Sequence, residues 1–129
     1  MTQQPDLAAT RETSVTERPT RAMDKELAEA LGWRFYLDHL GDARWEIPDS
    51  EGIYADHPLT LSAYPSWSCV GYLTQAMARR GYSWTIKRYA TEAGGGVHAS
   101  FGLHSASADT VPLAVGRAVL AALGKQPST

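Results

Sequence analysis

Cysteine, an excess of one charge sign and long apolar runs are all missing or scarce in this sequence of 129 residues. Its one cysteine, Cys69, cannot form a disulfide within the chain, which excludes a disulfide-stapled secreted scaffold and favours a reducing cytosol. No segment approaches the run of about 20 apolar residues that a transmembrane helix needs, and the N-terminus lacks the apolar centre of a signal peptide. These absences predict a cytoplasmic protein without a membrane segment.

The charges nearly cancel, with 12 basic and 14 acidic residues and a net charge of −2. This balance lacks the electrostatic footprint of a general nucleic-acid binder. A hydrophobic content of 43% with four tryptophans indicates a folded core and excludes disorder of the whole chain. The length is that of one domain.

Residues 1–22 are rich in Thr, Arg, Glu and Gln and carry no apolar period. Such a segment buries too little surface to offset the entropy lost on ordering. We therefore predict a disordered polar leader over residues 1–22 and a single α+β domain over residues 23–129. Translation starts at Met1 or at Met23, where the periodic sequence begins.

The apolar periods and the capping residues predict the order αββαββα, with a four-stranded antiparallel sheet packed against helices. A first helix runs from Met23 to Gly32, with Thr20 or Asp24 as its cap. A long connection without period over residues 48–65 is a candidate working loop. The remaining expected elements are a hairpin over 33–47, a helix over 67–79, a hairpin over 82–104 turned by Gly94 to Gly96, and a helix over 110–123.

Alternation along all four expected strands predicts one apolar sheet face covered by helices and one open polar face. An open face fits ligand or partner binding and fits simple solvation equally. All four tryptophans, Trp33, Trp45, Trp67 and Trp84, fall on inward positions and are expected in the core.

Four segments resemble those of the bacteriophage ABA-sandwich domain proteins: Leu31 to Trp33, Tyr64 to Ser68, Arg80 to Tyr82, and Val111 to Leu120. The resemblance covers roughly residues 27–124 and consists mostly of caps, turn residues and apolar positions. It implies a small phage or prophage protein without an assigned activity, and transfers no catalytic residue. The family name also implies helices on both faces of the sheet, whereas the alternation predicts one covered face.

No residue pattern identifies a cofactor or metal site, and none is expected. His98 and His104 lie six positions apart on one expected strand, about 20 Å at about 3.3 Å per residue, which is too far for one ion. The acidic residues of the long connection, taken with His57, do not follow the sequence spacing of ligands in a calcium-binding loop. Cys69, near the start of a helix, is either a nucleophile activated by the helix dipole or, more simply, a partly buried cysteine.

Charge is distributed unevenly along the chain. Residues 23–65 hold nine acidic and three basic side chains, whereas residues 66–129 hold two acidic and six basic ones. The acidic half suits a basic groove on another protein, and the later basic residues suit an acidic partner or a phosphate. Self-association is an alternative use of the same complementarity.

From these observations we expect a non-enzymatic phage or prophage protein that acts by binding, for example as an inhibitor of a host factor or of a defence complex such as CRISPR. Tyrosine and arginine are favoured at interfaces, so the expected surface combines the polar sheet face with the long connection: Arg34, Tyr36, Lys87, Tyr89 and His104 on the sheet, and Asp49, Glu51, Tyr54 and Asp56 on the connection. The alternative is a protein that binds or sequesters a nucleotide signal, or an enzyme acting on one. Its phosphate and base contacts would come from Lys87, Arg88, Tyr89, His98 and His104.

Overall fold

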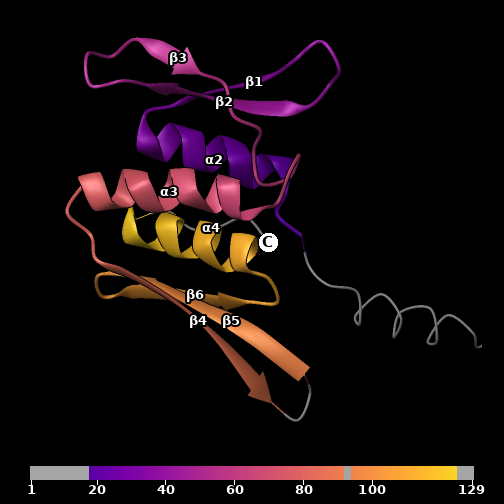
Figure 1. Ribbon diagram of the computed structural model, residues 1–129, viewed down its shortest axis with the longest axis vertical. Coiled ribbons are helices and arrows are strands. Elements are labelled where there is room, and N and C mark those ends of the chain that lie inside the picture. The colour runs from indigo at the N-terminus through magenta and orange to yellow at the C-terminus, as the bar shows by residue number, and fades with distance from the viewer. Residues whose placement is uncertain (1–17, 92–93, 125–129) are drawn as a thin grey trace, which may run out of the picture.

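The computed structural model describes residues 18–91 and 94–124, which form three helices and six strands (Figure 1). The elements follow the order αβββαβββα. Their bounds are α2 Arg21–Leu31, β1 Arg34–Leu37, β2 Ala43–Pro48, β3 Tyr54–Asp56, α3 Trp67–Arg79, β4 Trp84–Thr91, β5 Gly94–Phe101, β6 His104–Ala108 and α4 Val111–Ala122.

The strands form two antiparallel three-stranded sheets, in the orders β1-β2-β3 and β4-β5-β6. The α+β class is confirmed, but the expected single four-stranded sheet is wrong. β3 lies in the stretch expected to be structureless, and a turn at Gly102 and Leu103 separates β5 from β6. Gly94 to Gly96, expected as a turn, are the first residues of β5.

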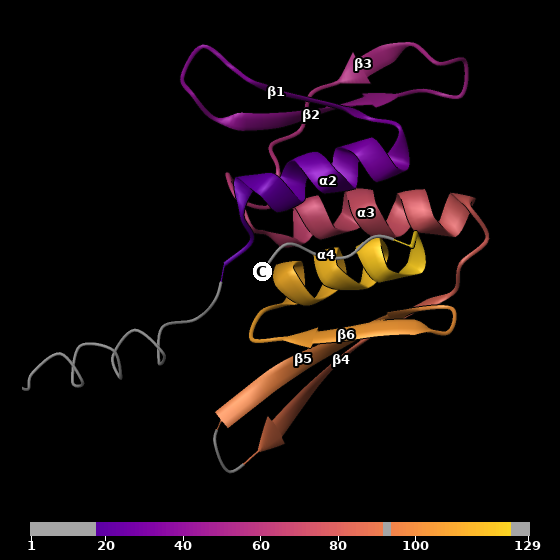
Figure 2. The same ribbon diagram turned by 180° about the vertical axis from the view of Figure 1, so that it is seen from behind.

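The helices lie between the two sheets, as Figure 1 and Figure 2 show from opposite sides. α2 packs against β1 and β2, whereas α4 packs against β5, β6, α2 and α3. Along β2, the side chains of Ala43, Trp45 and Ile47 are buried and those between them are partly exposed. Each sheet therefore has one face covered by helices, as the alternation predicts, and the arrangement is not a single sheet with helices on both faces.

Local signals in the sequence set the helix ends. Thr20 caps α2 by accepting a hydrogen bond from Met23 N at 3.1 Å, and Gly32 ends that helix with φ of 78°, a left-handed conformation that glycine adopts without strain. Thr110 caps α4, and Pro112 stands in its first turn. α2 begins at Arg21, inside the range predicted as leader. The predicted disorder of residues 1–17 falls outside the described residues.

The core lies between the sheets and is built around α4, whose inward positions from Val111 to Leu120 are buried. Trp45 is fully buried and packs edge-on against the half-buried Trp33, with ring centroids 5.2 Å apart. The expectation of a core position is wrong for Trp67 and Trp84, whose exposed fractions are 64% and 45%. Trp67 is the first residue of α3 and extends beyond the part of the helix that the core covers.

Candidate functional site

The first sheet carries a group of polar and aromatic side chains on the face turned away from the helices. Strand alternation places them there, because the residues between them on β2 point into the core. We call this group the outer face and define it by six residues: Arg34, Tyr36, Arg44, Glu46, Tyr54 and His57.

Cross-strand pairing sets the first contacts of the outer face. Arg34 is directly opposite Glu46 in the β1–β2 register, and its guanidinium lies 3.3 Å from Glu46 Oε1. The same guanidinium lies over the ring of Tyr54, 3.9 Å from the ring centroid, in a cation–π arrangement. Arg34 thus joins a carboxylate on β2 to an aromatic ring on β3, so the three strands share one contact.

His57, just after β3, connects the same carboxylate to Tyr36. His57 Nδ1 lies 3.0 Å from the Tyr36 hydroxyl and 3.2 Å from Glu46 Oε2. Both contacts therefore use a single ring nitrogen. A proton relay between a nucleophile and an orienting carboxylate needs both nitrogens of the imidazole, and these two contacts engage only one.

Arg44 fixes the loops at the two ends of the face. Its Nε donates to Asp38 Oδ2 at 2.8 Å, and its Nη1 donates to the His57 carbonyl at 2.6 Å. The bond from Arg44, with backbone amides of Asp42 and Leu40, holds the pKa of Asp38 below its ordinary value. The hairpin turn and the segment after β3 are thereby fastened to β2.

The predicted loop acids are adjacent to this face. Asp49 Oδ1 accepts hydrogen bonds from the amides of Glu51 and Ile53 and so shapes the β2–β3 turn. Asp49 and Asp56 line a hollow of about 520 Å³ together with Arg79 of α3. The turn is therefore an ordered acidic rim, with one arginine beside it.

Of the nine predicted site residues, the structure places six around the first sheet and the other three on the second. Lys87 and Tyr89 lie on β4 and His104 on β6, beyond the helices from the outer face (Figure 2). The prediction of one continuous surface is therefore wrong, because it assumed that all strands share one sheet.

The positions on the second sheet need a further correction. His104 pairs with the buried Phe101, which puts it on the helix-facing side at the end of the sheet. The hydroxyl of Tyr89 occupies the space beside Gly96, where an added Cβ would come within 2.6 Å of it. Arg88 alternates with Lys87 and so points to the opposite side of β4. The nucleotide surface predicted from these residues is not a single face.

Cys69 is buried, and its thiol donates to the carbonyl of Tyr64 at 2.8 Å. Burial raises the pKa of this thiol, which disfavours the thiolate that a nucleophile requires. Among residues 18–91 and 94–124, no group of three or more His, Cys, Asp or Glu side chains is placed to hold a metal ion. Within the same ranges, no helix is long and apolar enough to cross a membrane.

Three members of the outer face, Arg44, Glu46 and His57, were not among the predicted site residues. Arg44 and Glu46 follow from pairing the two strands across the turn at Gly41, because Tyr36 and Arg34 then lie opposite them. His57 has no such signal, since its position depends on β3 pairing with β2.

No family model, curated protein or solved structure matches the chain.

Proposed function

We propose that the protein acts by binding a protein partner through the outer face of its first sheet, without catalysing a reaction. The observation that carries the proposal is the linked set of contacts from Tyr54 through Arg34, Glu46 and His57 to Tyr36. Side chains already held in place lose less conformational entropy when a partner covers them. Arginine and tyrosine are also the types whose truncation costs most at interfaces.

The charge of this region defines the partner's chemistry. From Arg34 to His57 the chain holds two arginines and six carboxylates: Asp38, Asp42, Glu46, Asp49, Glu51 and Asp56. Both arginines are engaged with carboxylates, Arg34 with Glu46 and Arg44 with Asp38. The surplus of acids lies on the turns around the face and at the end of β3, so the proposed partner presents a basic surface to the rim and apolar or polar groups to the tyrosines.

A phage or prophage protein that inhibits a host factor or a defence complex is the role we propose for such a surface. Its support is the resemblance of the four sequence segments to phage proteins, together with the linked contacts of the outer face. Masking a basic site on a host protein requires only tight binding.

Capture from a lysate of the bacterium that carries the gene tests the proposal if variants are compared side by side. Arg34→Ala and Tyr36→Ala should lose a protein that the wild type retains, and Lys87→Ala, which removes one exposed charge from the second sheet, should retain it. Retention should fall as ionic strength rises, because charges on the rim are screened over about 8–10 Å in salt. Equal retention by all variants, or equal loss including Lys87→Ala, contradicts a role for the outer face.

A further inference from the structure

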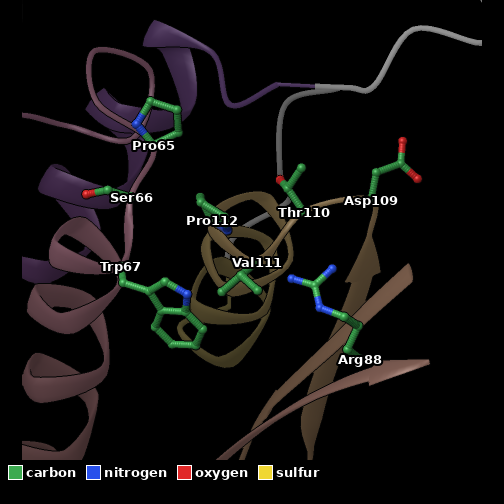
Figure 3. Close-up of a pocket in the computed structure, with 8 residues that line it drawn as sticks. All are labelled: Pro65, Ser66, Trp67, Arg88, Asp109, Thr110, Val111 and Pro112. Carbon is green, nitrogen blue, oxygen red and sulfur yellow. The ribbon is translucent and has the colours of Figure 1, made fainter. Parts of the chain in front are cut away.

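A pocket of about 220 Å³ lies at the second sheet, away from the outer face, where β4 meets the first turns of α3 and α4 (Figure 3). Its lining residues are Pro65, Ser66, Trp67, Arg88, Asp109, Thr110, Val111 and Pro112. The indole of Trp67 and the side chain of Arg88 reach toward Val111 from opposite sides. A large exposed ring and a cation thus face each other across one cavity.

Arg88 supplies the positive charge of the pocket. It shares strand parity with Ile86, which packs on the core, and pairs with the buried Val97, so it lies on the helix-facing side of β4. Among the described residues, no carboxylate lies within ion-pair distance of its guanidinium. Its side chain is exposed, so its positive charge is open to an anion from solvent where no carboxylate of the chain supplies the negative charge.

Neither neighbouring helix supplies that negative charge. The first turns of α3 and α4 contain no acidic residue, and both helices direct their positive ends at the pocket. The N-cap of α3, Ser66, makes no side-chain cap bond, so the first amides of that helix have no such acceptor. Asp109, on the pocket wall, is the one carboxylate among the lining residues, and it is not paired with Arg88. An anion bound between Arg88 and the helix starts would balance these charges.

We propose that this pocket binds a mononucleotide, with its phosphate at Arg88 and its base against Trp67. A guanidinium matches phosphate oxygens with two parallel hydrogen bonds, and an indole offers a flat face on which a base stacks. The volume is below the about 300–1,000 Å³ of sites for drug-sized ligands, so the pocket would enclose only part of a mononucleotide, and the rest would extend over the exposed ring of Trp67.

This site is separate from the outer face and does not depend on the proposed protein partner. It also differs from the nucleotide surface predicted from sequence, since only Arg88 belongs to both. Lys87 and Tyr89 point to the other side of β4.

Isothermal titration calorimetry of the full chain with AMP, GMP, CMP and UMP tests the proposal, with adenosine and inorganic phosphate as separate arms. We expect at least one mononucleotide to bind at least tenfold more tightly than adenosine or inorganic phosphate. Arg88→Gln and Trp67→Leu should each weaken that binding at least tenfold. Lys87→Gln removes the same charge one residue away and should change it less than twofold.

Circular dichroism melts of the three variants verify folding. Trp67→Leu replaces an exposed side chain, so this variant still tests the pocket if Arg88→Gln does not fold. Absence of heat with all four nucleotides overturns the proposal, as does equal binding of inorganic phosphate alone. Equal loss in Arg88→Gln and Lys87→Gln also overturns it, because that result reports general surface charge.

Discussion

Gly116 of α4 lies directly against Met23 of α2: a Cβ added at Gly116 would come within 2.9 Å of Met23 Sδ. The same atom would be 3.1 Å from Leu61 Cδ1, and both neighbours are buried, with exposed fractions of 1% and 0%. A missing side chain therefore sets how closely the last helix approaches the first.

The first prediction concerns this contact. Gly116→Ala should lower the free energy of unfolding by about 1 kcal/mol, because overpacking a filled core costs about 1–3 kcal/mol and exceeds the gain in helix propensity of about 1 kcal/mol. Gly116→Val should cost more. Urea denaturation followed by circular dichroism measures both.

Gly71 of α3 provides the matched control, since it is exposed and nothing lies within 4 Å of an added Cβ. Gly71→Ala should raise the free energy of unfolding by about 0.5–1 kcal/mol. If Gly116→Ala stabilises the protein as much as Gly71→Ala does, α2 and α4 do not pack as closely as the contact of Gly116 with Met23 requires.

A second prediction follows from Asp24, a fully buried carboxyl that accepts hydrogen bonds from the amide and hydroxyl of Ser62. Burial raises the pKa of Asp24 above its ordinary value of 3.8. The folded state therefore holds this proton more tightly than the unfolded state. The contribution of Asp24 to stability is full below the ordinary pKa and declines as the pH rises through the raised pKa.

Asp24→Asn keeps an acceptor for Ser62 and does not titrate. Relative to wild type, this variant should gain stability as the pH is raised from about 4 to about 7, measured by urea unfolding at a series of pH values. Asp24→Ala does not titrate either and should show the same trend from a lower starting point, with a loss of about 1–3 kcal/mol near pH 4 because the donors of Ser62 are left unpaired. If the free energies of unfolding of wild type and Asp24→Asn change in parallel with pH, the pKa of Asp24 is not raised in the folded state.

The third prediction tests the state of Cys69. Iodoacetamide should alkylate the folded wild type about a hundredfold more slowly than the urea-unfolded chain, because the thiol is buried and its pKa is raised. A Cys69→Ala chain that also carries Ser68→Cys has a thiol one residue earlier, at an exposed position of the same helix turn. Its folded form should react quickly, as followed by mass spectrometry. Equally fast reaction of the folded wild type would mean that Cys69 is accessible.

The fourth prediction separates the two tyrosines that the sequence assigned to one surface. With a captured partner in hand, Tyr36→Ala should weaken binding at least tenfold, or about 1.4 kcal/mol, whereas Tyr89→Ala should leave the affinity within twofold. The double variant should bind like Tyr36→Ala alone. If calorimetry shows that both single substitutions weaken binding equally, the two tyrosines belong to one binding surface.

Much of the secondary structure could be predicted because its signals are local. Thr20, Gly32 and Pro112 mark helix ends through their own backbone and side-chain chemistry. The break between β5 and β6 carries one local signal, Gly102, with φ of 61°. Alternation nevertheless continues through Phe101 to Leu103 and predicts an unbroken strand, although Leu103 is fully exposed in the turn. Alternation also does not determine which strands pair, so two sheets were predicted as one.

The contacts of the candidate site also differ in whether local signals predict them. Arg34 and Glu46 face each other because a hairpin fixes their register, and a hairpin can be predicted from its turn. The contact of His57 with Tyr36 joins residues 21 positions apart through a strand of three residues. Arg88 and Trp67 line one pocket only because α4 packs against both α3 and the second sheet, which no short pattern in the sequence indicates.

The buried position of α4 has a consequence for how the protein is made. This helix comes last among the described elements, yet it is what covers β5 and β6 and packs on both earlier helices. A nascent chain that has emerged only as far as β6 exposes the apolar faces of Val97, Ala99 and Phe101 with nothing to cover them. Folding of the second half is therefore expected to wait for synthesis of the last helix. A premature stop codon just before Val111 would leave a chain that is a substrate for chaperones and proteases.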